Sequence, residues 1–119
     1  MTSQFAKLIS RNHSGRPNLH IISRKKLLQA DRDHRGQGLG PVLDSWYRTA
    51  KSAQWKSLKE TRQTYAHADG VRVGDRVYTV FNIGGNQFRL ITEIFYEDQT
   101  ILVRHVLTHA EYDREDWKK

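Results

Sequence analysis

Hydrophobic and polar residues alternate along three runs in the second half of the chain, and turn-forming residues separate these runs. The runs cover residues 77–83, 86–96 and 100–107. Gly84 and Gly85 separate the first two runs, and a weaker turn at Asp98 and Gln99 separates the last two. Alternation directs successive side chains to opposite faces of a strand, and paired glycines favour a tight hairpin turn. The pattern therefore predicts a three-stranded antiparallel meander.

Two-residue loops at both turns would fix how these strands pair. The resulting cross-strand pairs are Phe81 with Phe88, Val80 with Arg89, Arg89 with Thr108 and Glu93 with Arg104. One face would then carry the apolar residues of a core, namely Phe81, Phe88, Leu90, Ile94, Val103 and Leu107. The other face would carry polar groups among apolar ones, namely Arg76, Arg89, Glu93, Arg104, Thr108, Ile91, Phe95 and Val106. Because a one-residue slip would exchange the faces, this assignment depends on both loop lengths.

The first half of the chain has helical rather than alternating spacing. A short strand at residues 19–22 precedes a helix at 24–33, for which Ser23 is a suitable N-cap. A loop at residues 35–41 then leads to a helix at 42–53, with Pro41 in its first turn. We expect Trp55 to pack on the fold and residues 60–69 to be irregular. The fold class predicted is α+β, with N-terminal helices packed on a small, mostly antiparallel sheet.

A short C-terminal helix is predicted directly after the third strand. Thr108 and Glu111 have the spacing of a capping box, with Thr108 as the N-cap. Residues three and four apart lie on the same side of a helix, so His109, Tyr112 and Asp113 would lie together. Imidazole, phenol and guanidinium groups are suited to the cleavage of a phosphodiester. The end of the sheet near Arg89 is therefore the predicted site of chemistry.

Length and composition set the class of protein. The 119 residues are enough for one domain, which we place at residues 19–119, with residues 1–18 as a flexible N-terminal extension. The chain contains no cysteine, which excludes disulfides and thiolate metal sites. It has neither a secretory signal nor an apolar run long enough to span a membrane. We therefore expect a soluble, cytoplasmic protein.

Positive charge is concentrated in the first part of the chain. Residues 1–67 contain 13 Lys or Arg against 4 Asp or Glu, whereas residues 68–119 contain 7 against 9. This asymmetry favours an anionic partner, nucleic acid more than membrane, although a merely solubilising basic face would give the same counts.

Two stretches resemble one family. The runs VFNIGGNQFRLI and VRHVLTHAEYD are similar to HigB-type toxins, mRNA interferases of the RelE-like toxin–antitoxin group, and the similarity extends back to about His20. The resemblance implies mRNA cleavage at the ribosome and restraint by a cognate helix-turn-helix antitoxin of the HigA type. A non-catalytic module that binds RNA or the ribosome is the alternative, and a protein-interaction domain without RNA is a third.

Cleavage of RNA without a metal needs a base for the 2′-hydroxyl, cations for the charge on phosphorus and an acid for the leaving oxygen. The predicted catalytic residues are Arg89, His109, Tyr112 and Arg104. Each has a structural alternative: cross-strand pairing for Arg89, neutralisation by Glu93 for Arg104, helix-start hydrogen bonding for His109 and packing for Tyr112. His105 would be a structural histidine of the core face.

Further basic residues would contact the phosphate backbone and add affinity without sequence preference. These predicted RNA-binding residues are Arg24, Lys25, Lys26, Lys56, Lys59 and Arg76. No cofactor is expected. His109 and Asp113 could form a pair, but no third residue has a metal-ligand spacing, so no metal site is predicted.

Overall fold

The computed structural model describes residues 19–22, 24–34, 36–85 and 87–119. The extension predicted at residues 1–18, the N-cap predicted at Ser23 and the turn residue Asn86 lie outside the described residues. Within the described part, no helix has the length and apolar character needed to cross a bilayer.

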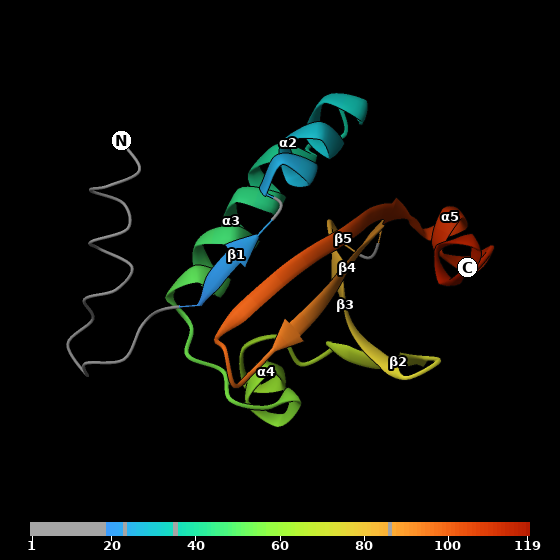
Figure 1. Cartoon of the computed structure of the whole chain (residues 1–119). Helices are drawn as coiled ribbons and strands as arrows, with labels where there is room; N and C mark the ends of the chain where they lie inside the picture. Colours follow the sequence, from blue (N-terminus) through green and yellow to red (C-terminus); the bar gives the residue numbers. More distant parts are fainter. Residues whose placement is uncertain (1–18, 23, 35, 86) are drawn as a thin grey trace.

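One mixed sheet is the centre of the fold. Its five strands are β1 (His20–Ile22), β2 (Asp69–Val73), β3 (Arg76–Ile83), β4 (Phe88–Phe95) and β5 (Thr100–Thr108). Their order across the sheet is β1-β5-β4-β3-β2. β1 runs parallel to β5, and the other neighbours are antiparallel. The predicted meander thus forms the middle of a wider, strongly twisted sheet (Figure 1).

The helices confirm the α+β prediction. They are α2 (Arg24–Asp33), α3 (Leu39–Ser52), α4 (Leu58–Thr64) and α5 (His109–Asp113), followed by the 3-10 turn η1 (Asp116–Lys118). α2 and α3 lie on one face of the sheet, and α5 lies beyond the end of β5 (Figure 1).

The irregular segment predicted at residues 60–69 is wrong in its first half, because α4 extends to Thr64. The side chain of Ser57 accepts a hydrogen bond from the backbone of Glu60 at 3.2 Å and so caps this helix. Thr61 is fully buried, and its hydroxyl hydrogen bonds with that of Tyr96 at 3.1 Å. Local capping and one buried threonine therefore stabilise a helix with little apolar periodicity.

The first hairpin differs from the predicted register by two residues. Both glycines have the left-handed backbone expected of them, with φ of 62° at Gly84 and 61° at Gly85. Pairing resumes only at Phe88, which faces Ile83, so that Asn82 rather than Val80 faces Arg89. Because a two-residue shift preserves the side-chain alternation, the predicted faces of these two strands are correct.

The second hairpin contains a β-bulge that sequence alternation did not reveal. Thr92 pairs with Val103, whereas Ile91 pairs with His105, so Arg104 is an extra residue in β5. The bulge changes the alternation by one residue toward the end of β5. The turn is also a four-residue loop rather than the predicted two-residue one, since Phe95 faces Thr100. The longer loop and the bulge together place Arg89 opposite Leu107 and not the predicted Thr108.

Four face assignments were wrong because of the bulge, and one of them is that of Thr108, which pairs with Phe88 of the core face. His105 and Leu107 lie on the Arg89 face rather than the core face, since they pair with Ile91 and Arg89. Val106 packs against the core instead. The predicted pairing of Glu93 with Arg104 was also wrong, because Glu93 faces Leu102.

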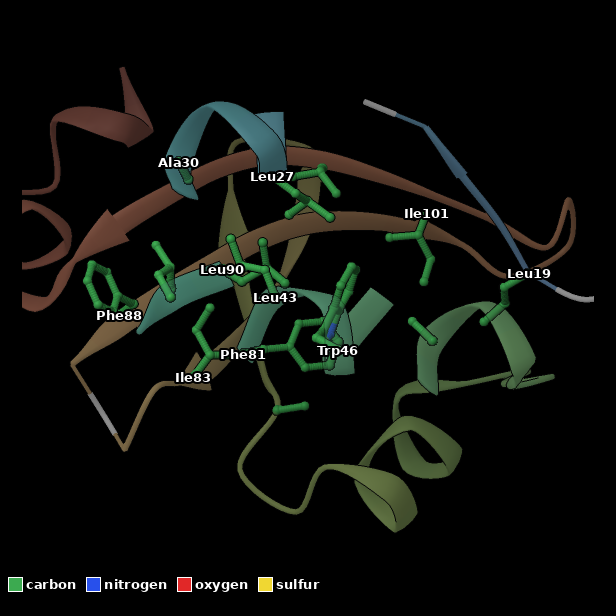
Figure 2. Packing of buried hydrophobic residues seen from close by; sticks show 14 of the residues in the cluster. Leu19, Leu27, Ala30, Leu43, Trp46, Phe81, Ile83, Phe88, Leu90 and Ile101 are labelled. Atoms are coloured by element: carbon green, nitrogen blue, oxygen red, sulfur yellow. The ribbon is translucent and has the colours of Figure 1, made fainter. Parts of the chain in front are cut away.

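The core lies between α2, α3 and the sheet (Figure 2). Trp46 from α3 contacts Phe81 edge to face, with ring centroids 5.5 Å apart. Phe88 and Leu90 of β4 are almost completely buried in the same cluster. The predicted docking of Trp55 is confirmed, since its ring stacks on Phe81.

Candidate active site

A polar groove lies on the sheet face that α2 and α3 leave open. Its volume is about 430 Å³. The lining residues come from α4, the segment before β2, the strands β2, β3 and β4, and α5, and they are Arg62, Ala66, His67, Ala68, Asp69, Val80, Asn82, Arg89 and Tyr112. Residues distant in sequence thus meet at one end of the open face, which is where the sequence placed the chemistry.

Arg89 supplies a buried cation to this groove. Its position in β4 between two strands leaves the residue only 8% exposed. Its guanidinium carbon lies 5.7 Å from the centre of the Tyr112 ring, and Nη1 donates to the carbonyl of Phe88 at 3.3 Å. A guanidinium held against an aromatic ring gains cation–π attraction and keeps its positive charge. Arg89 is therefore suited to hold an anionic group.

Tyr112 is brought to the groove by the predicted capping box. Thr108 accepts a hydrogen bond from the backbone of Glu111 at 3.1 Å, and the Glu111 carboxylate accepts one from the backbone of Thr108 at 2.9 Å. This confirms the predicted start of α5. Burial, followed by the negative charge of Asp69, raises the pKa of Tyr112 above its ordinary value of 10.0. The phenol is protonated at neutral pH, as an ordinary tyrosine is, and so carries a proton that it can donate.

The C-terminal turn holds the Tyr112 ring in place. The rings of Trp117 and Tyr112 are stacked, with centroids 5.4 Å apart and planes inclined by 15°. The indole nitrogen of Trp117 donates to the Tyr112 carbonyl at 3.2 Å. Trp117 also meets Tyr78 of β3 edge to face at 5.7 Å. A column of rings thus connects β3 with the groove.

Four groove residues were not singled out from the sequence: Arg62, His67, Asp69 and Asn82. Arg62 donates from Nε to the carbonyl of Ala68 at 2.8 Å, and its Nη2 lies 3.8 Å from the Asp69 carboxylate. Asn82 lies in β3 and lines the groove. A four-residue loop in the first hairpin would have placed it opposite Arg89, whereas nothing in the spacing of α4 and His67 indicated their proximity to β4.

His109 lies on α5 with Tyr112 but does not line the groove. It is exposed, and its Nδ1 lies 2.9 Å from the carboxylate of Asp113. The predicted pair of these two residues is therefore present. The catalytic role of His109 stays a prediction.

Arg104 and Arg76 belong to a different cluster, around Glu93. The Glu93 carboxylate lies 2.9 Å from Nε of Arg104 and 3.7 Å from Nη1 of Arg76. Neither arginine lines the groove of Arg89. The roles predicted for them in catalysis and RNA binding stay predictions.

The predicted RNA-binding lysines are exposed and lie outside the groove. Lys25 and Lys26 are on α2, Lys59 is on α4 and Lys56 precedes α4. Lys26 donates to the carbonyl of Arg104 at 2.9 Å. Arg24 begins α2, and its side chain is not among those described.

Within residues 19–22, 24–34, 36–85 and 87–119, no group of three or more histidine or acidic side chains could hold a metal ion.

Comparisons with known proteins identify the relatives of the chain. Residues 41–115 match a family described as HigB toxin, the RelE-like toxic component of a toxin–antitoxin system. The chain is 30% identical to the "mRNA interferase HigB" of Escherichia coli O6:H1 over 81% of this chain and 90% of that protein. It is also 30% identical to the "mRNA interferase toxin HigB" of Escherichia coli K12, over 80% of this chain and 88% of that protein. These matches span both walls of the groove.

Proposed function

Because this chain belongs to the HigB family of RelE-like toxins, we propose that it cleaves mRNA at the ribosome by attack of a ribose 2′-hydroxyl on the neighbouring phosphodiester. The chain is an endoribonuclease and the toxin of a toxin–antitoxin system. The ribosomal setting and the chemical route are the proposed part. The observation that carries this route is the meeting of Arg89 and Tyr112 in one polar groove.

The proposed reaction transfers two protons, forms one P–O bond and breaks another. The 2′-oxygen loses its proton to a base and bonds to phosphorus, and the 5′-oxygen then leaves with a proton from an acid. The products are a 2′,3′-cyclic phosphate and a 5′-hydroxyl. Arg89 would stabilise the additional negative charge on the phosphoryl oxygens, since fixed charges act strongly where water is partly excluded.

Tyr112 would be the acid for the leaving 5′-oxygen. The phenol is protonated at neutral pH, and its ring lies beside the Arg89 guanidinium. In this arrangement, the Tyr112 phenol donates a proton to the leaving oxygen, and the Arg89 guanidinium binds the phosphate. A positioned acid contributes roughly 10²–10⁴-fold to such a step.

Two histidines are candidates for the base. His109, indicated by the sequence, is on α5 and is paired with Asp113, whereas His67 lines the groove itself. The variants His109→Gln and His67→Gln distinguish them, because loss of the base lowers the rate of the chemical step with ribosome binding unchanged. Equal, full activity of both variants would contradict histidine catalysis.

The surroundings of the groove support a large anionic target. The net charge is +7, and Lys25, Lys56 and Lys59 are exposed. We infer that these lysines contact ribosomal RNA or the mRNA backbone in the cytoplasm. A helix-turn-helix antitoxin of the HigA type is proposed to hold the toxin inactive, by covering either the groove or this basic surface.

The test is mRNA cleavage on programmed ribosomes, with cut positions mapped by primer extension and RNA ends identified chemically. We expect discrete cuts whose RNA ends carry 2′,3′-cyclic phosphates. The cuts should persist in EDTA when the ribosomes have been cross-linked so that they remain intact without magnesium. Arg89→Ala is the inactive control. Cuts with 3′-hydroxyl ends, or cleavage that requires an added divalent metal, would overturn the route, and ribosome binding without cuts would overturn the activity.

A further inference from the structure

The groove at Arg89 continues around the edge of β3 toward α3. A hollow of about 160 Å³ shares His67 and Asn82 with the Arg89 groove. The same hollow shares Tyr65 and Asn82 with a compartment of about 390 Å³ at the start of α3. Because the three hollows share lining residues, they are neighbours, with Asn82 at their junction, and this row of hollows is called the channel below.

The topology of the sheet explains why this channel exists. β2 pairs with β3 only as far as Val80, which faces Asp69. In the described part of the chain, no strand pairs with residues 81–83 on the outer side of β3. The segment that connects α4 to β2 passes this edge instead, and it supplies Tyr65 and His67 to the walls. The channel can therefore lead from one face of the sheet to the other.

The two ends of the channel differ in chemistry. The end at Arg89 is polar, whereas the compartment at α3, called the α3 compartment below, is mainly apolar and aromatic. Apart from Asn82, the residues that line the α3 compartment are Pro41, Val42, Ser45, Trp46, Tyr65 and Ile83. A nucleotide has the same division, with an anionic phosphate and a flat base that stacks on apolar and aromatic side chains.

Trp46 adds a second observation at the apolar end. The residue is only 1% exposed, and its indole N–H has no hydrogen-bond acceptor among the described residues. Asn82 is exposed at the junction, where its amide can pair with a base or the sugar.

We propose that the α3 compartment binds an unpaired base of the RNA, one next to the phosphodiester that Arg89 holds. This inference rests on the proposed function and names a second contact of the same substrate. Asn82 lines both the Arg89 groove and the α3 compartment, so the two sites are adjacent. An RNA strand with its phosphate at Arg89 would thus place a neighbouring base at the apolar end.

The experiment removes the base and fills the compartment in turn. Synthetic mRNAs carry one abasic ribose at either position next to the cut, and single-turnover cleavage is measured on programmed ribosomes. In the unaltered protein, we expect one abasic position to lower kcat/KM by about ten-fold, as for the loss of one stacked base. Ser45→Trp should lower cleavage of the intact RNA by a similar factor and abolish sensitivity to that abasic position.

A matched control and an independent readout make the result decisive. Ser52→Trp introduces the same side chain at the end of the same helix, outside the channel, and should behave like the unaltered protein. Toxin binding to ribosomes programmed with mRNA that has a 2′-deoxyribose at the cut reports base dependence without cleavage. If the toxin cleaved no mRNA but its binding to programmed ribosomes still depended on the base, the proposed cleavage chemistry would be rejected. The assignment of the α3 compartment as a base-binding site would stand.

Three outcomes would overturn the assignment. One is equal cleavage and binding of intact and abasic RNAs by the unaltered protein. Another is retention of the abasic effect in Ser45→Trp, which would place the base elsewhere. The third is normal cleavage by Ser45→Trp together with escape from antitoxin inhibition, which would assign the compartment to the antitoxin.

Discussion

Two charged residues of β4 are buried on the same face of the sheet, four residues apart, and their surroundings differ. Glu93 is 6% exposed and lies between Arg104 and Arg76. Arg89 is 8% exposed and lies against the ring of Tyr112 at a groove. Because a strand rises about 3.3 Å per residue, the two residues lie roughly 13 Å apart along β4. The Glu93 carboxylate is flanked by two arginines, whereas Arg89 lies against an aromatic ring, whose face attracts a cation and carries no net charge.

The difference suggests how one strand serves both stability and function. A carboxylate neutralised by two arginines offers little charge to a ligand, so the Glu93 cluster should contribute mainly to the folded state. A cation beside a groove can stabilise an anion that enters it. Substitutions at the two ends should consequently change different measurements.

The largest effect is expected from Arg89→Ala. Loss of the groove cation should reduce the rate of mRNA cleavage by about 10²–10³-fold, the scale observed when one transition-state charge stabiliser is removed. Arg104→Ala is the matched control, because it also removes an arginine from this sheet face. Single-turnover cleavage on programmed ribosomes measures both. A loss of rate in a folded Arg104→Ala variant as large as in Arg89→Ala would contradict the contrast and restore the catalytic role predicted for Arg104.

Tyr112→Phe should produce the next effect, a loss of about 10²-fold in the rate of cleavage. The variant keeps the ring that contacts Arg89 and Trp117, so the loss would report the hydroxyl alone. An mRNA with a 5′-thio leaving group at the cut needs little proton donation and should restore the rate. Failure of this substrate to rescue Tyr112→Phe would contradict the assignment of the phenol as the acid.

At the other end of the face, Glu93→Gln should lower the free energy of unfolding by about 1–3 kcal/mol. The amide keeps the size of the side chain but removes the charge that Arg104 and Arg76 share. Urea denaturation measures this change. Cleavage at saturating ribosome concentration should remain within about two-fold, since a stability change affects the rate little while the protein stays folded. If Glu93→Gln left the free energy of unfolding unchanged but abolished cleavage, Glu93 would have a functional role, which contradicts the structural role assigned to it.

The smallest effect concerns His105, in the bulge beside Arg104. Burial, and then the positive charges of Lys26 and Arg104, lower the pKa of this histidine below its ordinary value of 6.5. The folded state thus binds the proton less tightly than the unfolded state. The contribution to stability is full above pH 6.5 and is lost as the pH falls through the lowered pKa. Because His105 is only partly buried, solvent screening should keep this loss small.

His105→Gln should therefore flatten the dependence of stability on pH in the acidic range. Urea midpoints measured at several pH values below 7 detect the change, and His20→Gln, at an exposed position in β1, is the control. An identical pH dependence in both variants would contradict a protonation penalty at His105.

Local patterns predicted most of the fold. The boundaries of α2 follow directly from apolar spacing, and the capping box of Thr108 and Glu111 predicted the start of α5. Alternation identified β3, β4 and β5 because each is buried on at least one face. α4 was missed since Ser57 and Thr61 stabilise it through individual contacts rather than through an apolar stripe.

Register and long-range packing were harder to predict. One extra residue at Arg104 reversed the faces of His105, Val106 and Leu107, and a bulge has no signal in alternation. The site was predicted in part, as Arg89 and Tyr112 meet. The opposite wall was not, because the contacts of Arg62 and His67 depend on how the segment before β2 crosses the sheet. Such contacts are properties of the tertiary structure.

The stacking of Trp117 on Tyr112 has an optical consequence. Of the three tryptophans, Trp46 and Trp55 are buried in the core, whereas Trp117 is partly exposed and lies one ring away from the groove. The intrinsic fluorescence that Trp117→Phe removes should thus come mostly from the edge of the site. The difference spectrum between the two proteins provides a label-free probe of RNA entering the toxin, built into the last few residues of the chain.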